Sequence, residues 1–177
     1  MPSILPFQGR APKIAADAWV APGATVIGDV EIGARSSIWF GCIVRGDVNV
    51  VRIGRGSNLQ DGTIVHVSGR EQGTFIGDGV LIGHACVIHA CTVADGAFVG
   101  MRACVMDGAV VEGGAMVAAG ALVTPGKVVR SGQLWAGSPA KHVRDLTAAE
   151  AAYIPAAADR YARYAEEYRR ALAKAAE

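Results

Sequence analysis

An aliphatic residue recurs every six positions along most of this chain, and this repeat constrains the fold more than any other feature of the sequence. The repeat breaks and restarts twice before its last phase, which runs from Val93 to Val129. Hexapeptide periodicity of this kind is typical of parallel β-helices. An α-helix is excluded over this stretch, because a period of six does not match 3.6 residues per turn and the frequent glycines would weaken a helix. The first phase of the repeat comprises Ile14, Val20, Val26, Ile32, Ile38 and Val44.

The repeat also predicts how each turn of such a solenoid, here called a coil, is built. Three hexads make one triangular coil, and neighbouring coils pair like strands of a sheet, about 4.8 Å apart. The aliphatic residue of each hexad points into the prism. Gly, Ala or Asp often follows it, as at Gly33 and Gly54, and glycines are expected at the corners, where φ is often positive. We therefore predict an all-β solenoid domain over residues 1–146, with its coils in residues 12–140.

A change of composition after Leu146 predicts a C-terminal helix over residues 147–177. Glycine disappears there and Ala, Glu, Arg and Tyr take over, while Thr147 and Glu150 have the spacing of a capping box. Pro155 is expected to break or kink the helix. One face of the helix is expected to pack on the solenoid, and it carries Tyr161, Tyr164, Tyr168 and Leu172.

Composition and charge exclude several classes of partner. The 177 residues carry a formal net charge of +1, which favours neither nucleic acid nor a strongly acidic partner. The N-terminal residues resemble neither a signal peptide nor a membrane span, so we expect a cytoplasmic protein without membrane contact. The four cysteines form no CxxC pair and are expected to be reduced and to point into the coils, although Cys86 and Cys91 lie near two histidines and are alternative soft ligands.

Three histidines near the breaks in the repeat, His66, His84 and His89, are the strongest functional signal. Three imidazoles that leave a fourth position open are a ligand set of catalytic zinc. His66 and His89 each follow an inward aliphatic residue, so both should point outward and stack on adjacent coils. His84 falls on another face or corner. We therefore expect a neighbouring subunit to complete the site, as in a threefold trimer.

Two polar clusters interrupt the apolar repeat near these histidines. The first is Arg45-Gly46-Asp47, and the second is Asn58-Leu59-Gln60-Asp61. The guanidinium of Arg45 can bind a carboxylate in bidentate fashion, and either Asp47 or Asp61 can supply it. Gln60 is expected to point outward, where its amide can bond a metal-bound hydroxide or a substrate oxygen.

Taken together, these residues resemble the γ-class carbonic anhydrases and their close hexapeptide-repeat relatives. The resemblance covers nearly the whole chain. Its further matching stretches are Ile38-Trp39-Phe40-Gly41, Ile82-Gly83-His84, Val99-Gly100-Met101 and Gly137-Ser138-Pro139-Ala140-Lys141.

The resemblance implies a left-handed parallel β-helix and a homotrimer with zinc, or iron or cobalt, held between subunits. It implies that His66 and His89 bind the metal from one chain and His84 from the next. Arg45 and Asp61 would pair across the interface with Asp47 nearby. Gln60 and Asn58 would orient the metal-bound water and carbon dioxide.

The chain departs from the family's archaeal prototype in its proton shuttle. Val48 stands where the prototype carries one of its glutamates, and Glu71 does not align with the shuttle residue. Tyr161, Glu71 or buffer would then carry the proton.

The function expected first is zinc-dependent, reversible hydration of carbon dioxide to bicarbonate by a metal-bound hydroxide. One alternative is a metal-dependent acyl-CoA thioesterase, and another is a catalytically silent metal-binding structural homologue. The hexapeptide acyltransferases share the fold but use a single histidine as general base, so the set of three argues against that class.

Overall fold

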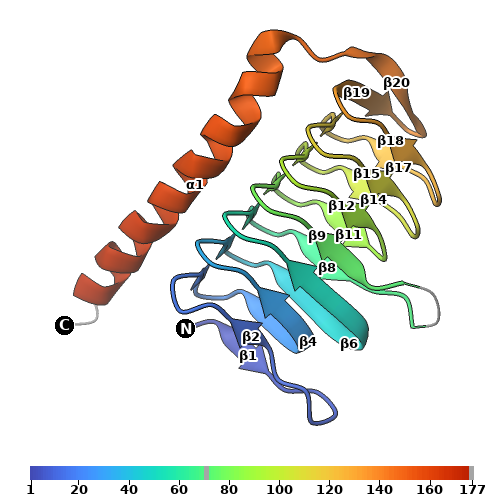
Figure 1. The fold of residues 1–177 in the computed structure, drawn as a ribbon. Coiled ribbons are helices and arrows are strands. Elements are labelled where there is room, and N and C mark those ends of the chain that lie inside the picture. The colour runs from blue at the N-terminus through green and yellow to red at the C-terminus, as the bar shows by residue number, and fades with distance from the viewer. Residues whose placement is uncertain (70–71, 176–177) are drawn as a thin grey trace.

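The computed structural model describes residues 1–69 and 72–175. They form a parallel β-solenoid of short strands followed by one long helix, α1 (Ala148–Lys174). The helix runs back along the solenoid from its C-terminal end toward its N-terminal coils (Figure 1). The predicted β-helix of hexapeptide repeats with a C-terminal helix is therefore confirmed.

A 12-stranded sheet forms two faces of the solenoid. The long strands β4 (Thr25–Ile32) and β6 (Ile43–Ile53) contribute to both, because their two halves pair with different neighbours. One face continues through β1 (Ser3–Leu5), β8 (Ile64–His66), β11 (Val87–His89), β14 (Cys104–Val105) and β17 (Leu122–Val123). The other continues through β2 (Lys13–Ile14), β9 (Thr74–Ile76), β12 (Thr92–Val93), β15 (Val110–Val111) and β18 (Val128–Val129).

An eight-stranded sheet forms the third face, along which α1 lies. Its last strand pairs antiparallel to the one before it and closes the C-terminal end of the stack. The strands in chain order are β3 (Trp19–Val20), β5 (Ser37–Ile38), β7 (Asn58–Leu59), β10 (Leu81–Ile82), β13 (Phe98–Val99), β16 (Met116–Val117), β19 (Gln133–Gly137) and β20 (Ala140–Asp145).

The repeated aliphatic residues stack on one another inside the prism. Val44 pairs with Val65, which pairs with Ile88, which pairs with Val105, and all four are fully buried. Val65 and Ile88 lie one coil apart, although the connection between β8 and β9 gives this coil more residues than three hexads contain. Breaks in the six-residue repeat are thus loops at the corners, and they leave the stack of side chains continuous.

The C-terminal helix is capped as predicted, but it is not broken. Thr147 and Glu150 form the capping box, and Arg144 donates two hydrogen bonds of 2.8 Å to the Glu150 carboxylate. The prediction of a break at Pro155 is wrong, since the helix continues past it. The predicted aromatic stripe packs only in part. Tyr161 packs against the core, and the ring of Tyr168 lies 5.4–5.7 Å from those of Trp19, Trp39 and Phe40. Tyr164, Tyr168 and Leu172 nevertheless stay about 40% exposed, and the buried helix residues are Ile154, Ala157, Ala158 and Ala165.

Three of the four cysteines point into the prism. Burial raises the pKa of the Cys42 and Cys91 thiols to about 12 and that of Cys86 to about 11. Cys104 differs from the prediction, because it pairs in register with the outward residue Val87 and is only partly buried.

Over residues 1–69 and 72–175, no helix has the length and apolar character that crossing a bilayer requires.

The pairing of Glu150 with Arg144 predicts an acid-dependent loss of stability at the start of α1. Hydrogen bonds from Arg144, and then from Thr147, lower the pKa of Glu150 to about 2. A lowered pKa stabilises the folded state above the unfolded-state pKa of about 4.3, and that contribution is lost as the pH falls through about 2.

Thermal unfolding between pH 5 and pH 2 checks this prediction. The stability difference between wild type and Glu150→Gln should shrink as the pH falls, and Arg144→Gln should remove most of the same pH dependence. A difference that stays constant over this range would contradict the prediction.

Candidate metal centre

His66 and His89 lie side by side on adjacent coils, as the hexad count predicts. They are the last residues of β8 and β11 and are paired in register. Each follows an inward residue, Val65 or Ile88, so both imidazoles point outward. His66 Nδ1 lies 3.2 Å from His89 Nε2, and the ring centroids are 5.2 Å apart.

An aspartate contacts the remote nitrogen of each of these two imidazoles. Asp47 Oδ1 lies 3.1 Å from His66 Nε2, and Asp107 Oδ1 lies 2.6 Å from His89 Nδ1. An ionised carboxylate only accepts hydrogen bonds, so the nitrogen that faces it carries the proton. In neutral imidazoles, His66 Nδ1 and His89 Nε2 therefore keep their lone pairs and face each other.

Two facing lone pairs at this distance suit a shared cation. Two nitrogens bound to one tetrahedral zinc by bonds of about 2.0–2.1 Å lie about 3.3 Å apart, close to the separation found here. Metal-binding histidines commonly donate their other N–H to a carboxylate, as both do. His66 and His89 thus fit one half of a zinc site. Within residues 1–69 and 72–175, no three His, Cys, Asp or Glu side chains gather to hold a metal.

His84 occupies a different place, at the corner after β10. Its Nδ1 lies 2.9 Å from Asp61 Oδ2, and both side chains are a little over 40% exposed. This contact leaves His84 Nε2 with a lone pair, in the same way as for the other two histidines. The three predicted ligands therefore lie in two separate candidate half-sites of one chain, the first with His66 and His89 and the second with His84.

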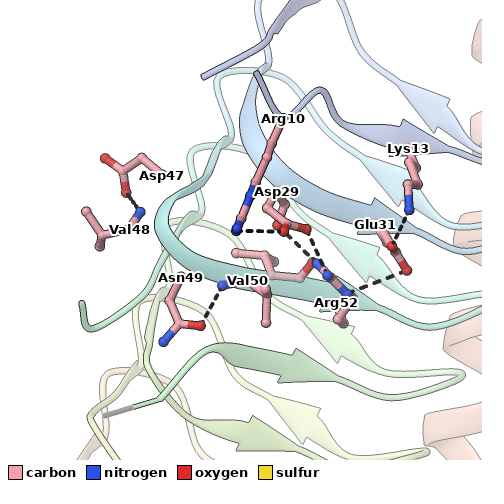
Figure 2. Close-up of polar contacts among 10 residues, drawn as sticks. Arg10, Lys13, Asp29, Glu31, Asp47, Val48, Asn49, Val50 and Arg52 are labelled. Atoms are coloured by element: carbon pink, nitrogen blue, oxygen red, sulfur yellow. Dashed lines mark hydrogen bonds and ion pairs between the residues drawn. The ribbon is translucent and has the colours of Figure 1, made fainter. Parts of the chain in front are cut away.

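Arg45 completes the first half-site. Its guanidinium forms an ion pair with Asp47 two residues further along β6, while Asp61 is engaged by His84 instead. Of the two carboxylates open to Arg45 from the sequence, Asp47 is its partner within the chain. Burial opposes ionisation of Asp47, but hydrogen bonds from Arg45 and His66 outweigh it and lower its pKa. The backbone N–H of Val48 also donates to Asp47, at 2.9 Å (Figure 2).

Gln60 lies beside His84 in the second half-site, and Asn58 contacts Gln60. Gln60 follows the inward Leu59 and is only 4% exposed, because α1 lies along this face of the sheet. Gln60 Nε2 donates to Asn58 Oδ1 at 3.2 Å, and Asn58 Nδ2 is buried without a partner in the described part of the chain. Gln60, His84 and Tyr161 line a cavity of about 290 Å³.

Tyr161 connects α1 to this half-site. Its ring packs edge-on against Trp39, with centroids 5.4 Å apart, and it lines a second cavity of about 440 Å³ together with His84 and Asp61. Burial raises the pKa of Tyr161, and the charge of Asp61 raises it further. Glu71, the other expected proton carrier, lies outside the described residues.

Asp107 is the residue that sequence reasoning missed. It lies 18 residues after His89, which is three hexads or one full coil. In the sequence, this spacing was the signal that could have suggested a contact between Asp107 and His89. The actual pairing of Ile88 with Val105 places Met106, and not Asp107, in register with His89, so counting alone does not identify the contact.

Comparisons with known proteins show which family the chain is similar to. Residues 11–46 match the hexapeptide family described as bacterial transferase hexapeptide (six repeats). The probable carbonic anhydrase of Methanocaldococcus jannaschii is 50% identical over 147 residues, which cover 83% of this chain and 92% of that protein. The chain belongs to the γ-carbonic anhydrase family.

A second curated relative and a solved structure are also similar to the chain. Gamma carbonic anhydrase 2, mitochondrial, of Arabidopsis thaliana is 50% identical over 162 residues, covering 89% of this chain but only 58% of the plant protein. The chain therefore spans about three fifths of that relative. The crystal structure of a hexapeptide transferase family protein from Anaplasma phagocytophilum superposes with a TM-score of 0.91 at 46% identity, covering 94% of this chain and 98% of the other.

The two half-sites generate a prediction about metal binding. We expect about one divalent ion per chain, and expect His66→Ala, His84→Ala and His89→Ala each to lose most of it, since a structural or catalytic zinc needs at least three protein ligands. Elemental analysis of the purified proteins measures this.

His142→Ala provides the matched control, because His142 lies on β20 with a half-exposed side chain, away from both half-sites. Full metal retention in His84→Ala would remove His84 from the ligand set.

Proposed function

We propose that this protein catalyses the reversible hydration of carbon dioxide to bicarbonate, at a metal held between subunits of a homotrimer. The observation that carries the proposal is the pair of imidazole nitrogens, His66 Nδ1 and His89 Nε2, which face each other at 3.2 Å with aspartates on their remote nitrogens. Relatives of the same family that are named carbonic anhydrases support it.

The separation of the half-sites supports the trimer. A closed ring of identical chains can bring His84 of each chain to the His66–His89 pair of its neighbour, so that three complete sites form. The face that carries this pair also presents a row of outward apolar side chains in register, Ile43, Ile64 and Val87, which are 37–43% exposed. A partner subunit on this face would bury that row.

Zinc suits three imidazole ligands best, and iron or cobalt suits the same donor set. When bound, zinc lowers the pKa of a coordinated water to about 7, which supplies a nucleophile at neutral pH. Asp47 and Asp61 would hold His66 and His84 in the protonation form that binds metal. In the trimer, Arg45 would also lie near Asp61 of the neighbour.

The amides of the second half-site would orient the substrate. Asn58 Nδ2 is a buried donor without a partner in the described part of the chain, and a buried unsatisfied donor costs about 1–3 kcal/mol. A carbon dioxide or bicarbonate oxygen would satisfy it. Gln60 would set the orientation of this amide, because it already bonds Asn58 Oδ1.

Proton transfer would depend on buffer. The raised pKa of Tyr161 means that its phenol keeps its proton at neutral pH, so it is a poor acceptor for a proton leaving the site. Val48 supplies no carboxylate at the position where the family prototype has a glutamate.

A cytoplasmic location stays a prediction from the sequence.

The cavities beside His84 favour a small neutral substrate over an acyl-CoA ester. The larger one is lined by aromatic side chains with the carboxylates of Asp61 and Glu167. Acidic groups at this place would repel the phosphates of coenzyme A. The thioesterase alternative needs a basic groove here, and a purely structural role leaves the buried Asn58 donor unexplained.

A stopped-flow assay on protein loaded with metal without oxygen tests the proposed reaction. We expect hydration that rises with pH through about 7 and that depends strongly on buffer concentration. Gln60→Ala should slow it about tenfold or more, because the Asn58 amide loses its fixed orientation.

Gln133→Ala is the control, since Gln133 bonds Trp135 on β19 and lies outside both half-sites. Fully metallated wild type without hydration above background would overturn the proposal. A rate independent of buffer would instead reveal an internal proton carrier.

The proposed assembly predicts a stable trimer that Arg45→Ala weakens. Removing Arg45 would take away the cation that pairs with Asp47, and breaking such a pair costs about 3–5 kcal/mol where the partner subunit buries it. Light scattering over a dilution series measures the dissociation.

Arg52→Ala is a matched control on the same strand. Arg52 pairs with Asp29 at 2.8 Å and Glu31 at 3.5 Å on a different face of the solenoid (Figure 2). We expect it to leave the trimer unchanged. A metal-bound monomer at micromolar concentration would rule out a site shared between subunits.

A further inference from the structure

We propose that Asp107 is a positioning residue of the metal centre, which holds the proton of His89 on Nδ1 and so presents Nε2 as the coordinating nitrogen. This inference rests on the proposed function. Asp107 does not touch the metal or the substrate in this proposal. It acts only through His89.

The contact between the two side chains is the closest of its kind in the described structure. Asp107 Oδ1 lies 2.6 Å from His89 Nδ1, compared with 3.1 Å between Asp47 and His66 and 2.9 Å between Asp61 and His84. Short distances of this kind are typical of charge-assisted hydrogen bonds. The side chains are 35% and 29% exposed, so the contact is only partly open to solvent.

The backbone around Asp107 is fixed by hydrogen bonds to the coils on both sides. The Gly108 N–H donates to the Ala90 carbonyl at 2.7 Å, and the Gly126 N–H donates to the Asp107 carbonyl at 2.9 Å. Gly108 itself has a φ of +67°, which closes the turn directly after Asp107. The carboxylate is therefore mounted on a rigid corner one coil away from His89.

Other aspartates at the corners of the solenoid have a different role. Asp78 accepts the backbone N–H of Arg55 at 2.6 Å, and Asp95 accepts that of Asp78 at 2.8 Å, so these side chains cap the turns. Over residues 1–69 and 72–175, the carboxylate of Asp107 bonds His89 alone. The capping role that explains the other corner aspartates does not explain Asp107.

The preference for one tautomer gives Asp107 its effect on the metal. A neutral imidazole can carry its proton on either nitrogen, and the form with the proton on Nε2 cannot coordinate through that atom. A carboxylate at Nδ1 stabilises the productive form, fixes the ring and makes Nε2 more basic. Loss of such a partner typically weakens metal binding 10–100-fold.

Zinc affinity measured by chelator competition tests the proposal. We expect Asp107→Ala to weaken binding 10–100-fold. Asp107→Asn should recover part of that loss, because its amide oxygen still accepts from Nδ1 without the negative charge. Asp95→Ala is the matched control: it removes a cap from a neighbouring corner and should leave zinc affinity within about twofold, whatever its effect on melting temperature.

The tautomer of His89 in the metal-free protein is a second and independent readout. The imidazole ¹⁵N shifts should report the Nδ1–H form in wild type and a mixture in Asp107→Ala. Wild-type affinity together with an unchanged tautomer in Asp107→Ala would overturn this inference and leave the proposed function standing. Wild type that binds no zinc would overturn the proposed function and this inference with it.

Discussion

Register between neighbouring coils is the constraint on which the rest of this structure depends. Parallel pairing places Val44, Val65, Ile88 and Val105 above one another, so the buried stack and the positions of all outward side chains are set together. A slip of one residue would turn every buried side chain outward. The contact between His66 and His89 follows from the same pairing and requires no feature of its own.

The outward positions carry the chemistry because each can differ without disturbing the stack. Each of the three histidines has its own aspartate, and each aspartate comes from another coil. Imidazoles on a rigid scaffold with fixed proton positions need little reorganisation to bind a cation. In the proposed trimer, dividing these groups between two places on one chain would link complete assembly of the site to association of the chains.

Much of the fold and half of the site could be predicted from the sequence. The six-residue period defined the prism, and counting hexads through the loop after His66 placed that residue beside His89. The burial of Gln60 could not be predicted in this way, since it depends on where α1 lies against the third face. Cys104 directly precedes the inward Val105, so the repeat places it outward, and it was misassigned because it was grouped with the other cysteines by residue type. Asp107 was missed because the pairing of Ile88 with Val105 puts Met106, and not Asp107, in register with His89. Pro155 was misjudged because it lies in the third turn of a long helix, where docking of Ile154 and Ala158 on the solenoid favours continuity.

The antiparallel pair of β19 and β20, which closes the stack, bears on how the molecule can change. In a solenoid each repeat contacts only its neighbours, so stability is close to a sum of local terms. The histidines and their aspartates all come from coils near the middle, between β6 and the turn after β14. The coils between that turn and the closing pair carry none of these side chains, so a change in their local stability would leave the register of the candidate site intact.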